Sequence, residues 1–225
     1  GNSTWVDVPT TTLPERRTWF EMASVKNKTV LLFGGVDNGG QNLDDTWMFD
    51  LSTNVWKKID TPTGGTSPAA RNAHAMASLG SGKAFMFGGA GTNGHTFNDT
   101  WMFDSSTNDW NKINPPTGTS PTARNYHAMA SLANESVLLF GGLDGSGKYL
   151  GDTWMFDFST HDWTEIKLLP TTATSSPPTR NGHAMASLGN EQVLLFGGQG
   201  ESENLDDTWV FDLTTKWAQI TTPTS

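Results

Sequence analysis

Residues 137–142 read Val-Leu-Leu-Phe-Gly-Gly, residues 152–154 read Asp-Thr-Trp, and a second tryptophan follows at Trp163. This pattern occurs four times. Its glycine pairs begin at Gly34, Gly88, Gly141 and Gly197, so successive copies are 54, 53 and 56 residues apart. A period of about 50 residues is typical of propellers and other repeat arrays. Each copy is therefore expected to be one unit that packs on its neighbours.

The third copy predicts four short antiparallel strands, at residues 127–132, 137–140, 152–157 and 163–166. The second strand is apolar throughout, which indicates that both of its faces are buried. The first strand alternates small residues at Ala128 and Ala130, as is needed where sheets converge. The Gly-Gly pair fits a close backbone approach that a Cβ would block. Four-stranded sheets with two apolar faces must stack, and stacking about an axis gives a β-propeller.

The recurring tryptophans are expected to pack between the sheets. Eight of the ten occupy the two repeat positions, and Trp5 matches the fourth-strand position of a preceding unit. Burial of one tryptophan removes about 150–250 Å² from water. Trp19 has no tryptophan counterpart in the other copies, so it is a candidate for a specific binding role.

Residues 121–132 read P-T-A-R-N-Y-H-A-M-A-S-L, and with the motifs above they resemble the kelch repeat. In detail they look like its galactose-oxidase-like, prokaryotic-style branch. The resemblance runs from about Trp5 to Ile220. It implies an all-β, kelch-type β-propeller with four complete four-stranded blades plus one extra N-terminal strand. Kelch propellers usually have about six or seven blades. They mostly bind proteins, and some are enzymes or sugar-binding proteins.

We expect one domain, with an extra outer strand and linker at 1–13 and blades at 14–67, 68–120, 121–176 and 177–225. The last turn, Asp212 to Trp217, is one residue shorter than its equivalents. The fourth strand of the last blade is therefore expected to be altered or displaced, with Trp5–Val8 completing that blade. A ring closed by this strand is favoured. The alternatives are a segment of a longer array, a two-chain ring of eight blades and an open-ended assembly.

Composition excludes several classes of protein. Fourteen basic against 23 acidic residues give a net charge of −9, which disfavours nucleic acid as a partner. The absence of cysteine excludes disulfides and thiolate metal sites. Apolar runs of four residues are too short for membrane insertion. Glycosylation sequons at Asn2, Asn27, Asn98 and Asn134 point to an extracellular or cell-surface location, and the compartment otherwise stays unknown.

Two polar residues recur just before or at the first strand. His74, His127 and His183 occupy one position, where the first copy has Phe20, and we expect each to cap the strand by bonding neighbouring backbone. A partial ring of metal or anion ligands is the alternative. An arginine recurs at Arg17, Arg71, Arg124 and Arg180. It is predicted to pair with the recurring Asp50, Asp104, Asp157 and Asp212, or else to receive carboxylates at a pore mouth. The residues Asp45, Asp99, Asp152 and Asp207 are interpreted as turn and strand-entry residues.

The loops between the second and third strands differ among the copies, and variation on a constant scaffold is where recognition is usually found. They cover residues 36–42, 90–96, 143–149 and 199–204. Besides Trp19 and the four arginines, the candidate binding residues are Asp37, Asn38, His95, Asp144, Lys148, Tyr149 and Glu201. Neither of the loops that begin at Asp37 and Asp144 completes a calcium-ligand series. No cofactor and no metal site is predicted.

Catalysis is not expected. A copper oxidase of the galactose-oxidase type needs a Tyr–Cys crosslink, and the chain has no cysteine. An active site also needs unequal groups at one place, whereas this chain repeats equal groups. We predict a non-catalytic binding or scaffold propeller that contacts a protein or peptide, or a glycan, through its loops. The alternatives are a carbohydrate-binding surface module, a homo-oligomer or propeller fragment that assembles by strand exchange, and a metal-dependent enzyme that uses the histidines.

Overall fold

The structure is a computed structural model that describes residues 12–26, 28–60, 67–132, 135–167 and 176–221. These ranges form β-strands and one 3-10 turn, η1 (Thr92–Gly94), so the all-β prediction is confirmed. The N-terminal strand expected at Trp5–Val8 lies outside the described residues, as do the sequons at Asn2, Asn27 and Asn134.

Four antiparallel sheets of four strands each make up the blades. Blade 1 contains β2 (Glu21–Lys26), β3 (Thr29–Phe33), β5 (Thr46–Asp50) and β6 (Val55–Ile59). Blade 2 contains β7 (Ala75–Gly80), β8 (Lys83–Phe87), β9 (Thr100–Asp104) and β10 (Asp109–Ile113). Blade 3 contains β12 (Ala128–Leu132), β13 (Ser136–Phe140), β15 (Thr153–Asp157) and β16 (Asp162–Glu165). Blade 4 contains β17 (Ala184–Gly189), β18 (Gln192–Phe196), β19 (Thr208–Asp212) and β20 (Lys216–Ile220).

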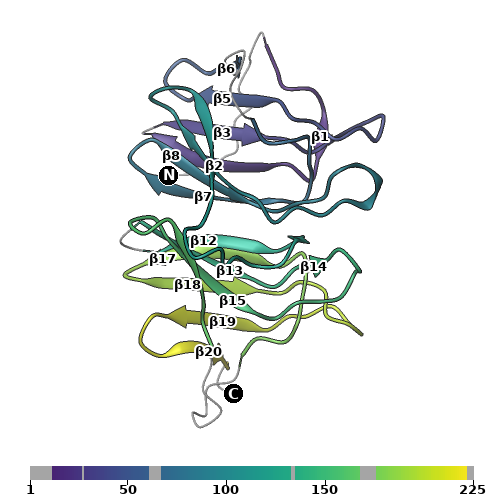
Figure 1. Cartoon of the computed structure of the whole chain (residues 1–225), viewed down its shortest axis with the longest axis vertical. Helices are drawn as coiled ribbons and strands as arrows, with labels where there is room; N and C mark the ends of the chain where they lie inside the picture. The colour runs from purple at the N-terminus through teal and green to yellow at the C-terminus, as the bar shows by residue number, and fades with distance from the viewer. Residues whose placement is uncertain (1–11, 27, 61–66, 133–134, 168–175, 222–225) are drawn as a thin grey trace, which may run out of the picture.

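The blades follow one another in chain order, with blade 1 at the top and blade 4 at the bottom of Figure 1. Their first strands are the innermost, and β7 lies between β2 and β12, with β17 next to β12. Three hydrophobic clusters fill the spaces between successive blades. No comparable packing joins blade 4 to blade 1 within the described ranges. The four blades therefore form an open arc, and the closed ring that the sequence favoured is not observed among these residues.

The glycine pairs lie where successive blades approach most closely. Gly35 donates its backbone N–H to the carbonyl of Arg71, the residue that leads into blade 2, over 2.8 Å. A Cβ on Gly34 would lie 2.6 Å from the same carbonyl oxygen, and Gly34 has a φ of 65°. The close approach predicted for this pair is therefore confirmed.

The turn between the third and fourth strands is closed by its first aspartate. Asp50 accepts hydrogen bonds from the backbone N–H and the hydroxyl of Ser52, and Asn54 takes a φ of 57°. The shorter turn in blade 4 uses the same device, because Thr214 N–H donates to Asp212 and Lys216 takes a φ of 62°. Blade 4 keeps a complete fourth strand, β20, paired with β19 along all five residues. The prediction that this strand is displaced was wrong, since the turn absorbs the missing residue.

Candidate functional site

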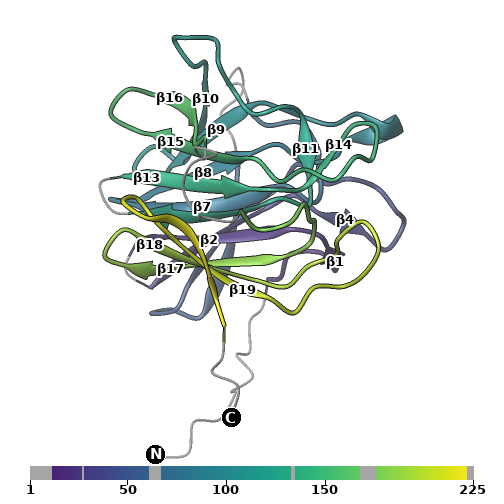
Figure 2. The ribbon, with the colours of Figure 1, turned by 90° about the horizontal axis from the view of Figure 1, so that it is seen from below.

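One end of the arc carries all the variable loops, at the right in Figures 1 and 2. Two short ladders place the segments before the inner strands at the same end. The strand β1 (Arg17–Thr18) pairs with β4 (Val36–Asp37), and β11 (Arg124–Asn125) pairs with β14 (Leu143–Asp144). We call this the loop end. The segments that lead into the inner strands and the loops after the second strands therefore form one surface.

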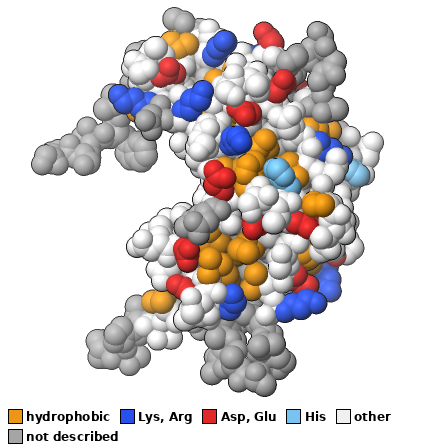
Figure 3. Space-filling model, turned by 60° about the vertical axis from the view of Figure 1, so that its left-hand side comes forward, with side chains coloured by type: hydrophobic (Ala, Val, Ile, Leu, Met, Phe, Trp, Pro, Cys, Tyr) orange, Lys and Arg blue, Asp and Glu red, His pale blue; other side chains and the backbone are white. Residues whose placement is uncertain are grey.

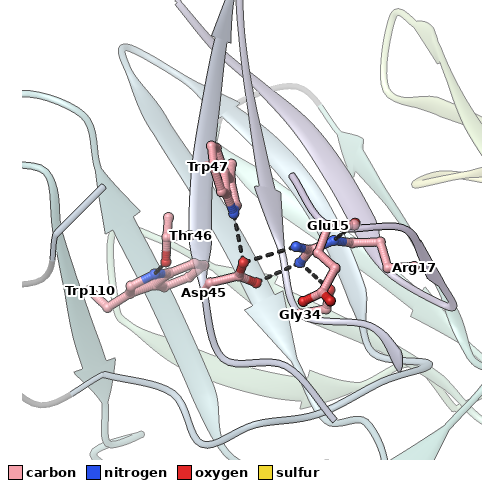
Figure 4. A network of polar contacts seen from close by, with 7 residues as sticks. All are labelled: Glu15, Arg17, Gly34, Asp45, Thr46, Trp47 and Trp110. Atoms are coloured by element: carbon pink, nitrogen blue, oxygen red, sulfur yellow. Dashed lines mark hydrogen bonds and ion pairs between the residues drawn. The ribbon is translucent and has the colours of Figure 1, made fainter. Parts of the chain in front are cut away.

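A buried ion pair supports the loop end in every blade. In blade 2 the guanidinium of Arg71 donates to the two carboxylate oxygens of Asp99 over 2.6 and 2.8 Å, and to the carbonyl of Gly88 over 2.9 Å. The same carboxylate accepts the indole N–H of Trp101 over 2.7 Å. Figure 4 shows the equivalent network in blade 1, around Arg17 and Asp45. The other pairs are Arg124–Asp152 and Arg180–Asp207.

These pairs correct the predicted partners of the arginines. Asp45, Asp99, Asp152 and Asp207 bind the guanidinium groups, whereas Asp50, Asp104, Asp157 and Asp212 close turns. Burial alone would raise the pKa of Asp99, but the hydrogen bonds and charge of Arg71 hold it below its ordinary value. Arg71, Arg124 and Arg180 are fully buried. Their donors are engaged inside the protein, which supports the structural role over ligand binding.

The three recurring histidines pack between blades. The ring of His74 lies against Phe33 of the preceding blade, with centroids 5.7 Å apart and planes at 74°. His127 and His183 pack in the same way on Phe87 and Phe140. Their ring nitrogens are buried and have no partner at hydrogen-bond distance, although those of His127 and His183 lie near the backbone of Phe87 and Phe140 in the preceding blade. The predicted cap on the neighbouring backbone of their own strands is therefore not formed. Burial, together with the charge of Arg71, lowers the pKa of His74 to about 3.

The histidines do not form a metal centre. Within the described ranges no group of three or more His, Asp or Glu side chains is arranged to hold a metal ion. His127 and His183 line an axial cavity of about 270 Å³ together with Glu21 and methionines of the inner strands. Burial raises the pKa of Glu21 to about 7. The cavity thus has one carboxyl and no opposing cation.

A column of four residues crosses the blades at the loop end, at the position just before each inner strand's histidine or phenylalanine. Ala73 N–H donates to the carbonyl of Trp19, Tyr126 N–H to Ala73, and Gly182 N–H to Tyr126, each over 2.9 Å. All four have left-handed backbone, with φ of 50° to 61°. This conformation costs an ordinary residue roughly 1 kcal/mol, and the inter-blade hydrogen bonds offset that cost. The backbone is thus constant along the column, while the side chains differ.

Two aromatic members of this column meet at the surface. Trp19 is 56% exposed, and its ring contacts half-buried Tyr126 edge to face, with centroids 6.2 Å apart. The small side chain of Ala73 between them leaves room for this contact. The two rings border an open depression of about 550 Å³. Its lining residues are Trp19, Tyr126, Asn181, Gly182, Gly198, Gln199 and Asn204. We call this depression the Trp19–Tyr126 bowl.

The predicted loop residues divide into two groups. Asp37 and Asp144 close their own loops: Asp37 accepts two backbone N–H groups at 2.7 and 2.8 Å, and Asp144 accepts those of Ser146 and Lys148. The exposed loop residues lie outside the lining of the bowl. They are Asn38, His95, Lys148 and Glu201, together with half-buried Tyr149. Of the predicted residues only Trp19 lines the bowl.

Four lining side chains were missed from the sequence. Tyr126 occupies the same repeat position as Trp19, just after the arginine and one further residue, and this alignment could have identified it. Gln199 and Asn204 bound the variable loop at 199–204 that was predicted to take part in recognition, but the sequence does not show that this loop lies beside Trp19, and Asn181 carries no signal. It is blade 4, three repeats away, that supplies them.

The fold and these repeat positions define a class of protein. A family model described as the KLHDC2/KLHL20/DRC7 Kelch-repeats domain matches residues 1–168 and 115–225. The chain belongs to the kelch-repeat family. The resemblance inferred from the sequence is confirmed at this level, and the narrower likeness to the galactose-oxidase-like branch stays a prediction.

Several proteins that are similar to this chain are much longer than it. The chain is 32% identical to F-box/kelch-repeat protein At1g51550 of Arabidopsis thaliana, over 86% of this chain and 42% of the relative. It is 31% identical to Adagio protein 3 of the same plant, over 83% of this chain and 29% of the relative. It is 31% identical to mouse Kelch domain-containing protein 1, over 73% and 39% respectively. The chain thus spans less than half of these relatives. The described parts of the chain contain no helix of the length and apolarity needed to cross a membrane.

Proposed function

We propose that this chain is a non-catalytic interaction propeller and that the Trp19–Tyr126 bowl receives an extended segment of a partner protein. The observation that carries the proposal is the exposure of Trp19, 56%, in a chain whose strand tryptophans pack in the blades. Tryptophan and tyrosine are enriched among the residues that dominate protein–protein binding energy. An exposed, edge-to-face aromatic pair on a fixed backbone is a preorganised anchor of this kind.

The rest of the bowl supplies hydrogen bonds, and the blade 4 loop beside it carries negative charge. The amides of Asn181, Gln199 and Asn204 offer both donors and acceptors, which suits a peptide backbone. Exposed Glu201 and Glu203 stand in the same blade 4 loop, and the chain carries a net charge of −9. We therefore expect the partner segment to present an apolar side chain to the rings and lysine or arginine beside it. A cation over an aromatic face adds about 0.5–1 kcal/mol at exposed sites.

The relatives support this role. Their names combine kelch repeats with an F-box in one case and identify a kelch domain in another. A repeat propeller that belongs to a larger protein is suited to present one surface to a partner while other segments act elsewhere.

A displayed library of linear peptides, selected on the wild-type chain, tests the proposal. The selected peptides are expected to carry an apolar residue flanked by Lys or Arg. Trp19→Ala should weaken their binding by about 30-fold or more, as expected for loss of a hot-spot aromatic. Alanine suits this backbone, since Ala73 adopts the same conformation in blade 2. Tyr126→Ala should weaken binding in the same direction.

The matched control is Leu51→Ala. Leu51 is 55% exposed and lies in the turn between β5 and β6, at the end of the blade away from the variable loops. It should leave the affinity unchanged. Selected peptides that bind Trp19→Ala and wild type equally would overturn the proposed site. Binding of neutral oligosaccharides that depends on Trp19, with no peptide selected, would assign the bowl to carbohydrate instead.

A further inference from the structure

The residue that follows the third strand of a blade packs over the interface with the blade before it. In blade 3 this residue is Phe158, which packs on the hydrophobic cluster between blades 2 and 3, with its ring centre 4.8 Å from the Nζ of Lys83 in blade 2. In blade 4 it is Leu213, which packs on the cluster between blades 3 and 4. In blade 2 it is Ser105. The interface between blades 1 and 2 therefore has a small polar side chain where the next two have a large apolar one.

The backbone holds this position in the same way in blades 2 and 3. Ser105 N–H donates to the carbonyl of Gly82 over 2.9 Å, and Phe158 N–H donates to the carbonyl of Glu135 over 3.3 Å. Gly82 and Glu135 occupy one repeat position, in the turn between the first and second strands. The hydroxyl of Ser105 is buried and has no hydrogen-bond partner among the described residues. The two turns thus share their backbone contacts, and the side chain alone decides how well each interface is filled.

A groove of about 330 Å³ opens between blades 1 and 2 beside Ser105. Met48, which packs on the hydrophobic cluster between these blades, and Val55, which is 44% exposed, give it apolar walls. The groove lies between two successive blades and not at an end of the arc. We call it the Ser105 groove. Its lining includes Lys26, Met48, Asp50, Val55, Lys57 and Ser105.

Positive charge prevails at the edge of the groove. The Nζ of Lys26 donates to the carbonyl of Ser105 over 3.3 Å, and Lys57 is exposed. The carboxylate of Asp50 accepts hydrogen bonds from the backbone N–H and the hydroxyl of Ser52 in its own turn. Figure 3, which is turned toward this end of the molecule, shows Lys and Arg side chains over the upper part, where blades 1 and 2 lie. In a chain with a net charge of −9, the Ser105 groove is thus a local basic site.

We propose that the Ser105 groove binds an aromatic side chain of a partner protein that carries Asp or Glu beside it. The aromatic ring then lies where Phe158 lies in the following interface, and the adjacent carboxylate meets Lys26 and Lys57. Burial of one aromatic side chain removes about 150–250 Å² from water. An acidic neighbour complements the charge of the two lysines. The groove is at the end of the blades opposite the loop end, so binding there is independent of the Trp19–Tyr126 bowl.

The probe is a displayed peptide library with a fixed Phe-Asp pair, selected on the Trp19→Ala chain so that the bowl does not contribute. Selected peptides should bind Trp19→Ala and the wild-type chain equally. Ser105→Phe should weaken their binding by about 30-fold or more, because the chain's own phenylalanine then occupies the groove. Ser105→Leu, which introduces the residue type of blade 4 at this position, is the second filling variant, and thermal melting checks that both variants fold.

Lys57→Ala should weaken binding by about 5-fold, and replacement of the peptide's Asp by Asn should remove this dependence on Lys57. Asn111→Phe is the matched control, because it adds the same side chain at an exposed position of blade 2 outside the lining of the groove. It should leave the affinity unchanged. Peptides that bind Ser105→Phe as tightly as wild type, or a library that yields no binding peptide, would overturn the proposal. Binding of phenylacetate that Ser105→Phe abolishes, with no peptide selected, would assign the groove to a small aromatic acid instead.

Discussion

The indole N–H of Trp163 in blade 3 donates to the hydroxyl of Thr100 in blade 2 over 3.0 Å, in a buried environment. This bond crosses the space between two sheets that share no backbone ladder. It couples an outer strand of one blade to the third strand of the blade before it. Successive blades are therefore joined by side-chain hydrogen bonds at the outer edge of the arc and by backbone hydrogen bonds at its loop end.

Thr100→Val should lower the free energy of unfolding by about 1–3 kcal/mol, because it leaves a buried indole donor without an acceptor. The measurement is urea unfolding followed by tryptophan fluorescence. Thr208→Val is the matched control, since Thr208 begins the third strand of blade 4 and accepts from no tryptophan among the described residues. It should change stability by less than about 0.5 kcal/mol. Equal losses in both variants would show that the inter-blade bond contributes nothing.

Gly88→Ala should be more destabilising than Gly197→Ala. Both glycines have nearly the same φ, 68° and 67°, so the backbone strain of an alanine is common to them. A Cβ on Gly88 would lie 2.6 Å from the carbonyl oxygen of Arg124, whereas on Gly197 the nearest atom is 3.2 Å away. We expect the difference in unfolding free energy to exceed about 2 kcal/mol, the scale of overpacking costs. Thermal and urea unfolding would measure it, and equal effects would mean that the blades separate readily at this point.

Asp99→Asn should lower the unfolding free energy by about 3–5 kcal/mol, because the fully buried guanidinium of Arg71 loses its charge partner. The exposed pair of Lys167 and Glu165, 3.5 Å apart, provides the comparison. Lys167→Ala should cost less than about 0.5 kcal/mol. If Asp99→Asn unfolded at the same urea concentration as wild type, the ion pair of Arg71 and Asp99 would not be a main source of stability.

Stability should fall as the pH drops from about 6.5 toward 3. Burial lowers the pKa of His74 and of His183 from 6.5 to about 3. Between these two pH values the unfolded chain binds protons at these histidines and the folded chain does not. Each such histidine contributes about 1.4 kcal/mol per pH unit in this window. His74→Phe should reduce the slope by that amount, and Phe is the residue that the first repeat carries there. Identical slopes would show that folded His74 binds a proton readily.

Other groups do not obscure this comparison. The pKa of Glu21 is raised to about 7, so the stability it contributes is lost as the pH rises through that value. Arg71 and its equivalents hold the pKa values of the paired aspartates below 3.8, so their contribution is lost only at lower pH. Both effects are common to wild type and His74→Phe, and they cancel in the difference between the two profiles.

The strands and blades could be predicted from the sequence because the signals are local and repeated four times. The aspartate that pairs with each recurring arginine could not be predicted. Asp45 lies just before the five-residue strand β5, and Asp50 is the last residue of that strand. A strand of this length spans about 17 Å, so the two aspartates lie at opposite ends of the blade. Choosing between them requires knowing that the arginine segment and the loop after the second strand share one end. The histidines were misassigned because a partner in the preceding blade is invisible to local reasoning.

The site was predictable only in part for the same reason. Trp19 stood out because it breaks the repeat, and Tyr126 could have been found by aligning the same position. The amides of blade 4 enter the bowl through the curvature of the arc, which no single repeat encodes. The open arc itself depends on how many blades one chain brings together, and the repeat pattern does not limit that number.

In the column of Trp19, Ala73, Tyr126 and Gly182, the backbone joins the blades while the side chains determine the shape of the surface. The fold uses the N–H and C=O groups of all four residues, whereas the space around their side chains differs: Trp19 is exposed, Ala73 is buried, and a Cβ on Gly182 would meet nothing within 4 Å. A propeller built in this way can acquire a different recognition surface by a few substitutions at one repeat position, with its blades unchanged. Grafting an aromatic residue onto Gly182 would thus change the proposed binding surface while leaving the scaffold in place.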